Sequence, residues 1–143
     1  MKGSFDLERF VKAQNPEWNS ILSELREGDK RGHWMWFVFP QLKGLGSSPN
    51  ANHFGITSRA EDKAYLDHSI LGPRLLECTT LVNSVEGRSI EAIFGEIDAM
   101  KFRSSMTLFS EVALDNEVFE EAIKKYYRGE ADQLTLKILK AKG

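Results

Sequence analysis

Apolar residues recur at helical spacing along most of the chain. Trp18, Ile21, Leu22 and Leu25 follow one another at i, i+3, i+4 and i+7, the pattern of a helix with one buried face. Similar spacing, together with helix-capping residues, predicts helices over about residues 5–14, 16–27, 58–68, 73–87, 89–95, 96–112, 116–129 and 131–141. We therefore expect a mainly α protein, one compact domain over residues 1–143 with about seven or eight helices and at most a few short strands.

The segment over residues 96–112 is apolar on most sides of the predicted helix, so we expect this helix to be central. Met100, Met106 and Phe109 are expected to be buried in it. In the last predicted helix, Leu134, Ile138 and Leu139 are expected to face inward.

Two segments depart from the helical pattern. Residues 34–39 (Trp-Met-Trp-Phe-Val-Phe) are six consecutive large apolar residues, which indicates burial on all sides. Periodicity does not separate a buried strand from a buried helical turn here, and the short length and aromatic content favour a strand.

Residues 44–52 are rich in Gly, Ser and Asn, which predicts a surface loop. The segment is not a phosphate-binding fingerprint, because Pro49 and two Asn follow it and no Lys-Ser/Thr pair closes it. A lid over a nearby pocket is the alternative interpretation of this loop.

Composition and charge exclude several classes of protein. No apolar run approaches the roughly 18 residues of a membrane span, and the N-terminal residues lack an apolar signal-peptide stretch. The single cysteine, Cys78, cannot form an internal disulfide, so we expect a cytoplasmic protein. The formal net charge of −2 argues against nucleic acid as a partner.

The histidines and the cysteine do not form a metal-binding pattern. No two of His33, His53 and His68 stand at i, i+3 or i, i+4, and there is no cysteine pair. We therefore predict no metal and no cofactor. Cys78 lies within an apolar helical pattern, which is typical of inert packing.

Polar residues next to the aromatic segment are the first candidates for a binding site. His33 and Gln41 flank Trp34 and Trp36. Apolar core is the plain interpretation of the segment, but two indoles beside polar groups are also typical of a pocket for a flat ligand.

The second candidate cluster lies on the predicted central helix. Asp98, Lys101 and Ser105 share one helix face, and Ser104 is close to it. Polar groups among apolar positions must be hydrogen-bonded, so they form either a structural network or a site.

The chain resembles a bacterial family, the domain of unknown function family 1810, in motifs that follow one another along nearly its whole length. These motifs are Trp34–Gln41, Gly44–Ser47, Ala64–His68, Leu71–Leu75 with Glu77 and Cys78, Phe94–Gly95, and Asp98–Phe109. The resemblance implies a small, mostly helical cytoplasmic domain, without an established activity or agreed catalytic residues.

A more distant resemblance is to the NADAR domains, and it rests on Gly55–Ser58, Glu61 and Lys101 with Phe102. It implies substrates of the ADP-ribose type and N-glycosidic cleavage. The Glu-His pair of that pattern is absent here, because Asp62 follows Glu61.

These observations support two hypotheses. In the first, the domain binds or acts on a nucleotide-, ADP-ribose- or sugar-phosphate-like small molecule. Trp34 and Trp36 would form a wall, and the polar contacts would come from Gln41, Asp98, Lys101, Ser104 and Ser105. Glu61 or His33 would transfer a proton if the domain is an enzyme, which the sequence leaves open. In the second hypothesis, the protein is a non-catalytic helical interaction module.

Overall fold

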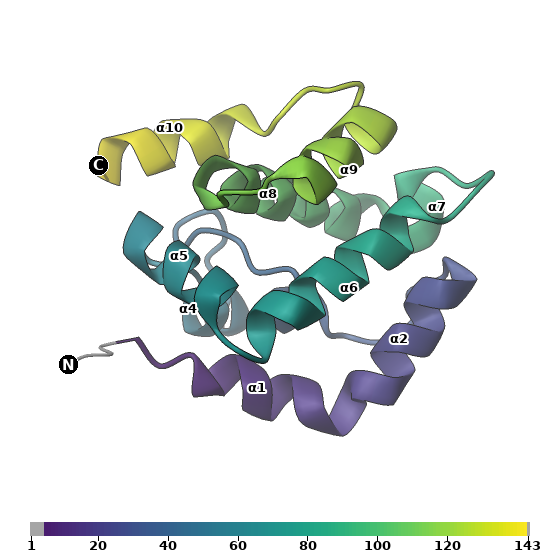
Figure 1. Cartoon of the computed structure of the whole chain (residues 1–143), viewed down its shortest axis with the longest axis horizontal. Helices are drawn as coiled ribbons and strands as arrows, with labels where there is room; N and C mark the ends of the chain where they lie inside the picture. The colour runs from purple at the N-terminus through teal and green to yellow at the C-terminus, as the bar shows by residue number, and fades with distance from the viewer. Residues whose placement is uncertain (1–4, 143) are drawn as a thin grey trace.

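The computed structural model of the chain describes residues 5–142, and these residues form a mainly α structure, as predicted. The helices, all labelled in Figure 1 except α3, are α1 (Glu8–Gln14), α2 (Trp18–Glu27), α3 (Met35–Val38), α4 (Pro49–Phe54), α5 (Arg59–Asp67), α6 (Leu71–Asn83), α7 (Ile90–Phe94), α8 (Glu96–Val112), α9 (Glu117–Tyr127) and α10 (Gln133–Lys142). A 3-10 turn over Asn15–Glu17 joins α1 to α2. The described residues contain no strand, only an isolated parallel bridge between Leu42 and Ile56.

The helix α8 lies at the centre of the packing, as expected. It contacts α5, α7, α9 and α10, while α6 crosses the molecule between α2 and α9 (Figure 1). Phe102, Met106 and Phe109 of α8 are fully buried.

The expectation that Met100 and Leu134 are buried was wrong, since their exposed fractions are 72% and 52%. On α8 the inward positions are Ala99 and Phe102, and Met100 lies about 100° around the helix from Ala99. Apolar character alone therefore did not identify which face of α8 meets its neighbours.

The expected strand over residues 34–39 is instead the short helix α3. Val38 N donates to the carbonyl of Trp34, and Phe39 N donates to the carbonyl of Met35. These local bonds satisfy the backbone because no other extended segment runs alongside to pair with it in the described chain. Burial was predicted correctly for Trp34, Met35, Phe37, Val38 and Phe39, which all belong to the core, but Trp36 is only partly buried.

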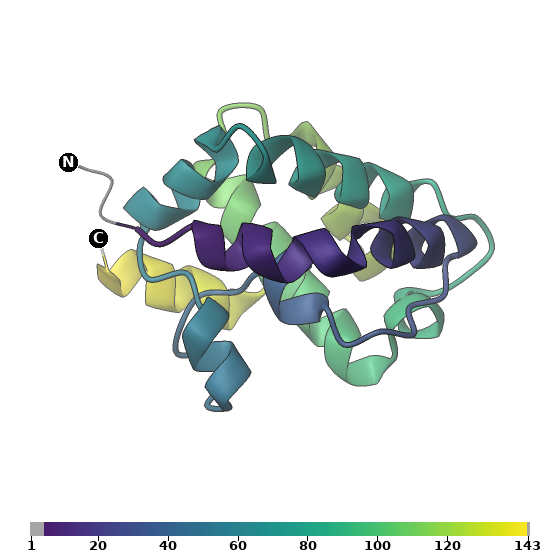
Figure 2. The ribbon, with the colours of Figure 1, turned by 90° about the horizontal axis from the view of Figure 1, so that it is seen from below.

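The predicted loop over residues 44–52 is partly helical, because α4 begins at Pro49. Ser48 caps this helix by accepting a hydrogen bond from Ala51 N at 3.1 Å. None of the α4 residues is buried, and Figure 2 shows α4 standing out from the body of the molecule.

A backbone crossing closes the base of this loop. Lys43 N donates to Ile56 O at 2.8 Å, and Ile56 N donates to Gln41 O at 2.8 Å. The two segments approach so closely that a Cβ on Gly55 would lie 2.7 Å from the Cα of Lys43. Only glycine fits at this position.

A buried carboxylate fixes the turn that leads into α3. Glu24 accepts hydrogen bonds at Oε1 from the indole of Trp34 (3.0 Å) and from the backbone N–H groups of Arg31 (2.7 Å) and Gly32 (2.9 Å). Burial alone would raise the pKa of Glu24, but these three bonds hold it below its usual value.

We predict that Glu24→Ala lowers the free energy of unfolding by about 3 kcal/mol, because it leaves the indole of Trp34 and two backbone donors without an acceptor. Chemical denaturation measures this change. The exposed Glu27 on the same helix is the matched control, and Glu27→Ala should cost less than about 1 kcal/mol. Equal losses for the two variants would contradict the structural role of Glu24.

Candidate functional site

A cavity of about 450 Å³ opens between α8, the segment after α3, the loop before α4, and the start of α10. It is lined by Trp36, Gln41, Leu45, Gly46, Ser47, Ser48, Ala51, Ile97, Met100, Lys101, Ser104, Asp132 and Leu134. Its volume is in the range of small-molecule sites. Four parts of the chain that are distant in sequence therefore contribute to one hollow.

Lys101 is the cation of this cavity. Its Nζ lies 4.3 Å from the centre of the Trp36 ring and 3.4 Å from Oδ1 of Asp98. The other oxygen of Asp98 lies closer, at 2.7 Å, to Nζ of Lys30. Because two cations share one carboxylate, this cluster carries a net positive charge next to the cavity, which favours an anion there.

Asp132 provides a carboxylate on another side of the cavity. Its Oδ2 accepts hydrogen bonds from Ser104 Oγ (3.1 Å) and from Thr135 N (3.1 Å), so Asp132 caps α10 and ties it to α8. Asp132 was not among the residues predicted from the sequence. The hydrogen bond to Ser104 spans 28 residues, and no local pattern indicates such a pairing.

Three large apolar side chains form a rim at this cavity. Ile97 and Met100 are each 72% exposed, and Leu134 is 52% exposed. They come from α8 and α10, and all three are among the residues that line the hollow. Large apolar side chains exposed side by side are typical of surfaces that bind something.

The structure brings together four of the predicted binding residues: Trp36, Gln41, Lys101 and Ser104 all line the cavity. Another predicted residue, Asp98, does not line the cavity but pairs with Lys101, which does. Residues 45–48 and Ala51, which belong to the proposed lid over residues 44–52, also lie in the wall. Lys101 and Ser104 lie on the same face of α8 because they stand three residues apart in a helix with 3.6 residues per turn.

The other predicted residues lie elsewhere. Trp34 is fully buried in the core with its indole N–H on Glu24, and Ser105 is fully buried on the inner face of α8. His33, a candidate for proton transfer, is exposed and does not line the cavity with Gln41 and Lys101.

Glu61 opens on a different hollow of about 540 Å³, together with Arg9, His53 and Thr57. Its Oε2 pairs with Arg9 Nη2 at 3.0 Å, and its Oε1 accepts from the backbone N–H and the hydroxyl of Thr57 at 2.8 Å each. Arg9 also donates to the carbonyls of His53 and Gly55. These bonds engage both charged groups in holding α1 against the crossing at Gly55.

The adjacent Asp62 is fully buried, and neither of its carboxyl oxygens has a hydrogen-bond partner among residues 5–142. Burial raises the pKa of Asp62 to about 8, with nearby Arg59 opposing the shift and Glu61 adding to it. The carboxyl is therefore protonated in the folded protein at neutral pH.

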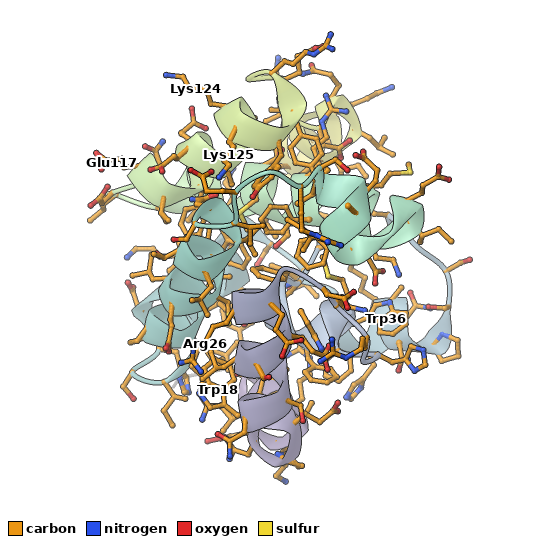
Figure 3. All side chains as sticks on the ribbon, turned by 90° about the vertical axis from the view of Figure 1, so that its right-hand side faces the viewer. Trp18, Arg26, Trp36, Glu117, Lys124 and Lys125 are labelled. Atoms are coloured by element: carbon orange, nitrogen blue, oxygen red, sulfur yellow. The ribbon has the colours of Figure 1, made fainter. Side chains whose placement is uncertain are left out.

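A larger hollow of about 730 Å³ lies along α9, with Glu117, Glu120 and Lys124 in its wall. Figure 3 shows Glu117 and Lys124 well apart from Trp36. This hollow has no aromatic side chain in its wall, which is mostly charged, so it offers less to a flat or apolar ligand than the cavity at Trp36.

Three further observations bear on the chemistry available. Among residues 5–142, no cluster of three or more His, Cys, Asp or Glu is placed to bind a metal ion, and no helix is long and apolar enough to cross a membrane. Burial raises the pKa of the Cys78 thiol to about 12, which keeps it from acting as a nucleophile.

Comparison with known proteins gives a family and a structure. The family model described as "Protein of unknown function (DUF1810)" matches residues 4–139. A solved structure described as the conserved hypothetical protein Rv1873 from Mycobacterium tuberculosis is similar, with 57% sequence identity and a TM-score of 0.95. The alignment covers 96% of this chain and 99% of that one. No curated protein matches the chain.

The raised pKa of Asp62 predicts a stability that falls with increasing pH. Between the ordinary value near 3.8 and about 8, the unfolded chain releases this proton and the folded chain keeps it. The free energy of unfolding should therefore decrease by up to about 1.4 kcal/mol per pH unit in that window, and level off above it. Asp62→Asn should remove this decrease and raise stability at pH 8, as measured by urea denaturation at a series of pH values.

The exposed Asp67, on the same helix, is the control for the Asp62 measurement. Asp67→Asn should leave the pH dependence close to that of the wild type. If Asp62→Asn has the wild-type slope between pH 5 and 8, the carboxyl of Asp62 is not protonated in the folded state.

Proposed function

We propose a ligand-binding function for this chain, which belongs to the family described as "Protein of unknown function (DUF1810)", as the resemblance of its motifs predicted. The cavity beside Trp36 binds a small phosphate-bearing molecule of the nucleotide, ADP-ribose or sugar-phosphate type. Lys101 is the contact for the anionic group. The single cysteine supports a cytoplasmic location for this activity.

One observation carries this proposal: the ammonium of Lys101 lines a cavity and shares the carboxylate of Asp98 with Lys30. Its distance to Asp98 is 3.4 Å, while Lys30 takes the other oxygen of Asp98 at 2.7 Å. Lys101 is therefore held in place by the Trp36 ring and a shared carboxylate, and it keeps donor capacity for an incoming anion.

The remaining wall residues suit a small polar ligand. Ser47 and Ser48 offer hydroxyl groups, and Gln41 offers an amide, all of which can bind phosphate or sugar oxygens. The apolar rim of Ile97, Met100 and Leu134 can cover a less polar part of the same molecule.

We propose binding rather than N-glycosidic hydrolysis in this cavity. Glu61 and His33, the candidates for proton transfer, do not line it. Both carboxylate oxygens of Glu61 are already engaged, Oε2 by Arg9 and Oε1 by Thr57.

We predict that Lys101→Met keeps the fold and loses the binding of phosphate-bearing ligands, because the side chain keeps its length and loses its charge. The measurement is the melting temperature of wild type and variant with adenosine 5′-monophosphate, ADP-ribose and ribose 5-phosphate. At a hundredfold excess over the dissociation constant, a ligand should stabilise the wild type by about 2.7 kcal/mol, a shift of several degrees.

The control is Lys140→Met, which removes an exposed lysine from α10. It should keep the shift, and Lys101→Arg should keep most of it because the charge remains. If Lys101→Met binds these probes as well as the wild type, the proposed site is wrong.

The alternative function, a non-catalytic helical interaction module, has one observation in its favour. Ile97, Met100 and Leu134 form an exposed apolar group that could dock another protein. If none of the three probes shifts the melting temperature of the wild type, this alternative replaces the small-molecule proposal.

A further inference from the structure

We infer that the ligand of the cavity at Trp36 is a 5′-ribonucleotide, and that Asp132 recognises its ribose through the 2′ and 3′ hydroxyl groups. This inference rests on the proposed function and narrows it from phosphate-bearing molecules to those with a free ribose diol beside the phosphate.

The position of Asp132 is fixed by contacts on one side of its carboxylate. Oδ2 accepts from Ser104 Oγ, from Thr135 N and from the Thr135 hydroxyl. The backbone N–H of Asp132 donates to Thr107 Oγ1 at 2.8 Å. These bonds anchor the residue between α8 and α10.

The other oxygen of this carboxylate, Oδ1, receives no hydrogen bond from any of residues 5–142, and Asp132 lines the cavity. An ionised carboxylate only accepts hydrogen bonds, so its partner in a ligand must donate. Phosphate is excluded from this end of the cavity because it is an anion without strong donors at neutral pH. Sugar hydroxyl groups donate without adding charge, and a vicinal diol can offer two O–H groups to one carboxylate.

The two ends of the cavity therefore favour different polar groups of a ligand. Lys101 favours an anion, and Asp132 favours hydroxyl donors. Ser104, which contacts Asp132, follows Lys101 by three residues on α8, so both groups are anchored to the same helix face within about one helical turn. A ribose with a phosphate at its 5′ carbon carries an anion and a diol within one small molecule, as these two ends of the cavity require.

The apolar rim accounts for the third part of the ligand. Ile97, Met100 and Leu134 are exposed next to the polar ends. A nucleobase on the ribose would cover apolar surface that otherwise faces water, which stabilises the complex. The volume of about 450 Å³ accommodates a mononucleotide.

The test compares each of the four common 5′-ribonucleoside monophosphates with its 2′-deoxy counterpart, by isothermal titration calorimetry on the wild-type protein. We expect at least one base to bind, with the ribose form at least tenfold tighter than the deoxyribose form. In Asp132→Asn, the amide oxygen can still accept from Thr135 N and cap α10, while the amide nitrogen faces the cavity as a donor. This variant should melt within a few degrees of the wild type and bind both forms to within about threefold.

The matched control is Asp115→Asn. Asp115 accepts a hydrogen bond from Glu117 N at the start of α9, away from this cavity, and its replacement should leave the ribose preference unchanged.

The outcomes separate the two proposals. Equal affinity of the wild type for ribose and deoxyribose forms, with both lost in Lys101→Met, overturns the role of Asp132 and leaves the phosphate site standing. A ribose preference that persists in Asp132→Asn also overturns it. If none of the nucleotides binds, while ribose 5-phosphate or ADP-ribose still binds through Lys101, the inference that the ligand is a mononucleotide is wrong. The proposed phosphate site at Lys101 then still stands.

Discussion

Two backbone hydrogen bonds at the crossing of residues 41–43 with Ile56 determine where the cavity lies. They close residues 43–55 into a loop whose helix, α4, has no buried residue of its own. Phe54, at the end of α4, packs against Phe10 and Phe37, with ring centroids 5.7 and 5.4 Å apart, so the base of the loop and this aromatic contact together hold it in position. Gln41 stands at this crossing, and residues 45–48 and Ala51 follow in the closed loop. The backbone crossing thus holds in place the wall of the cavity that Gln41 and this loop form.

The opposite wall depends on a chain of charges that begins in the core. Glu24 holds the indole of Trp34, and Lys30 lies 5.1 Å from the centre of the Trp34 ring. Lys30 in turn pairs with Asp98, which is shared with Lys101. In this series of contacts, the distances are short at Glu24 (3.0 Å to the indole of Trp34) and at Lys30 (2.7 Å to Asp98), and longer at Lys101 (3.4 Å to Asp98). Lys30 therefore holds Asp98 in place, while the ammonium of Lys101 remains available to a ligand.

The sequence was a good guide wherever local interactions decide the structure. The periodicity of residues 96–112 matches α8 to the residue, and Ser58 and Ser89 cap their helices through the N–H groups of Glu61 and Ala92. The shared helix face of Lys101 and Ser104 was likewise predictable, because it follows from their spacing in the sequence.

What the sequence did not predict depends on contacts between distant segments. The segment over residues 34–39 contains the helix α3 (Met35–Val38) rather than a strand because no partner strand lies beside it among residues 5–142, and its own sequence does not contain that information. Met100 and Leu134 are apolar, but their exposure depends on where α7 and α10 pack. Asp132 belongs to the site only because the chain returns to α8 after α9.

The stacking of Lys101 on Trp36 has a thermodynamic consequence for any ligand with two parts. The ammonium occupies the indole face, so an aromatic ring can reach that face only after the ammonium moves. An anion that draws Lys101 away also frees the ring surface, and a ring that displaces Lys101 leaves a cation ready for the anion. The two parts of such a ligand would assist each other by the same coupling free energy in both directions. The cavity would then bind the whole molecule more tightly than the separate affinities of its fragments suggest.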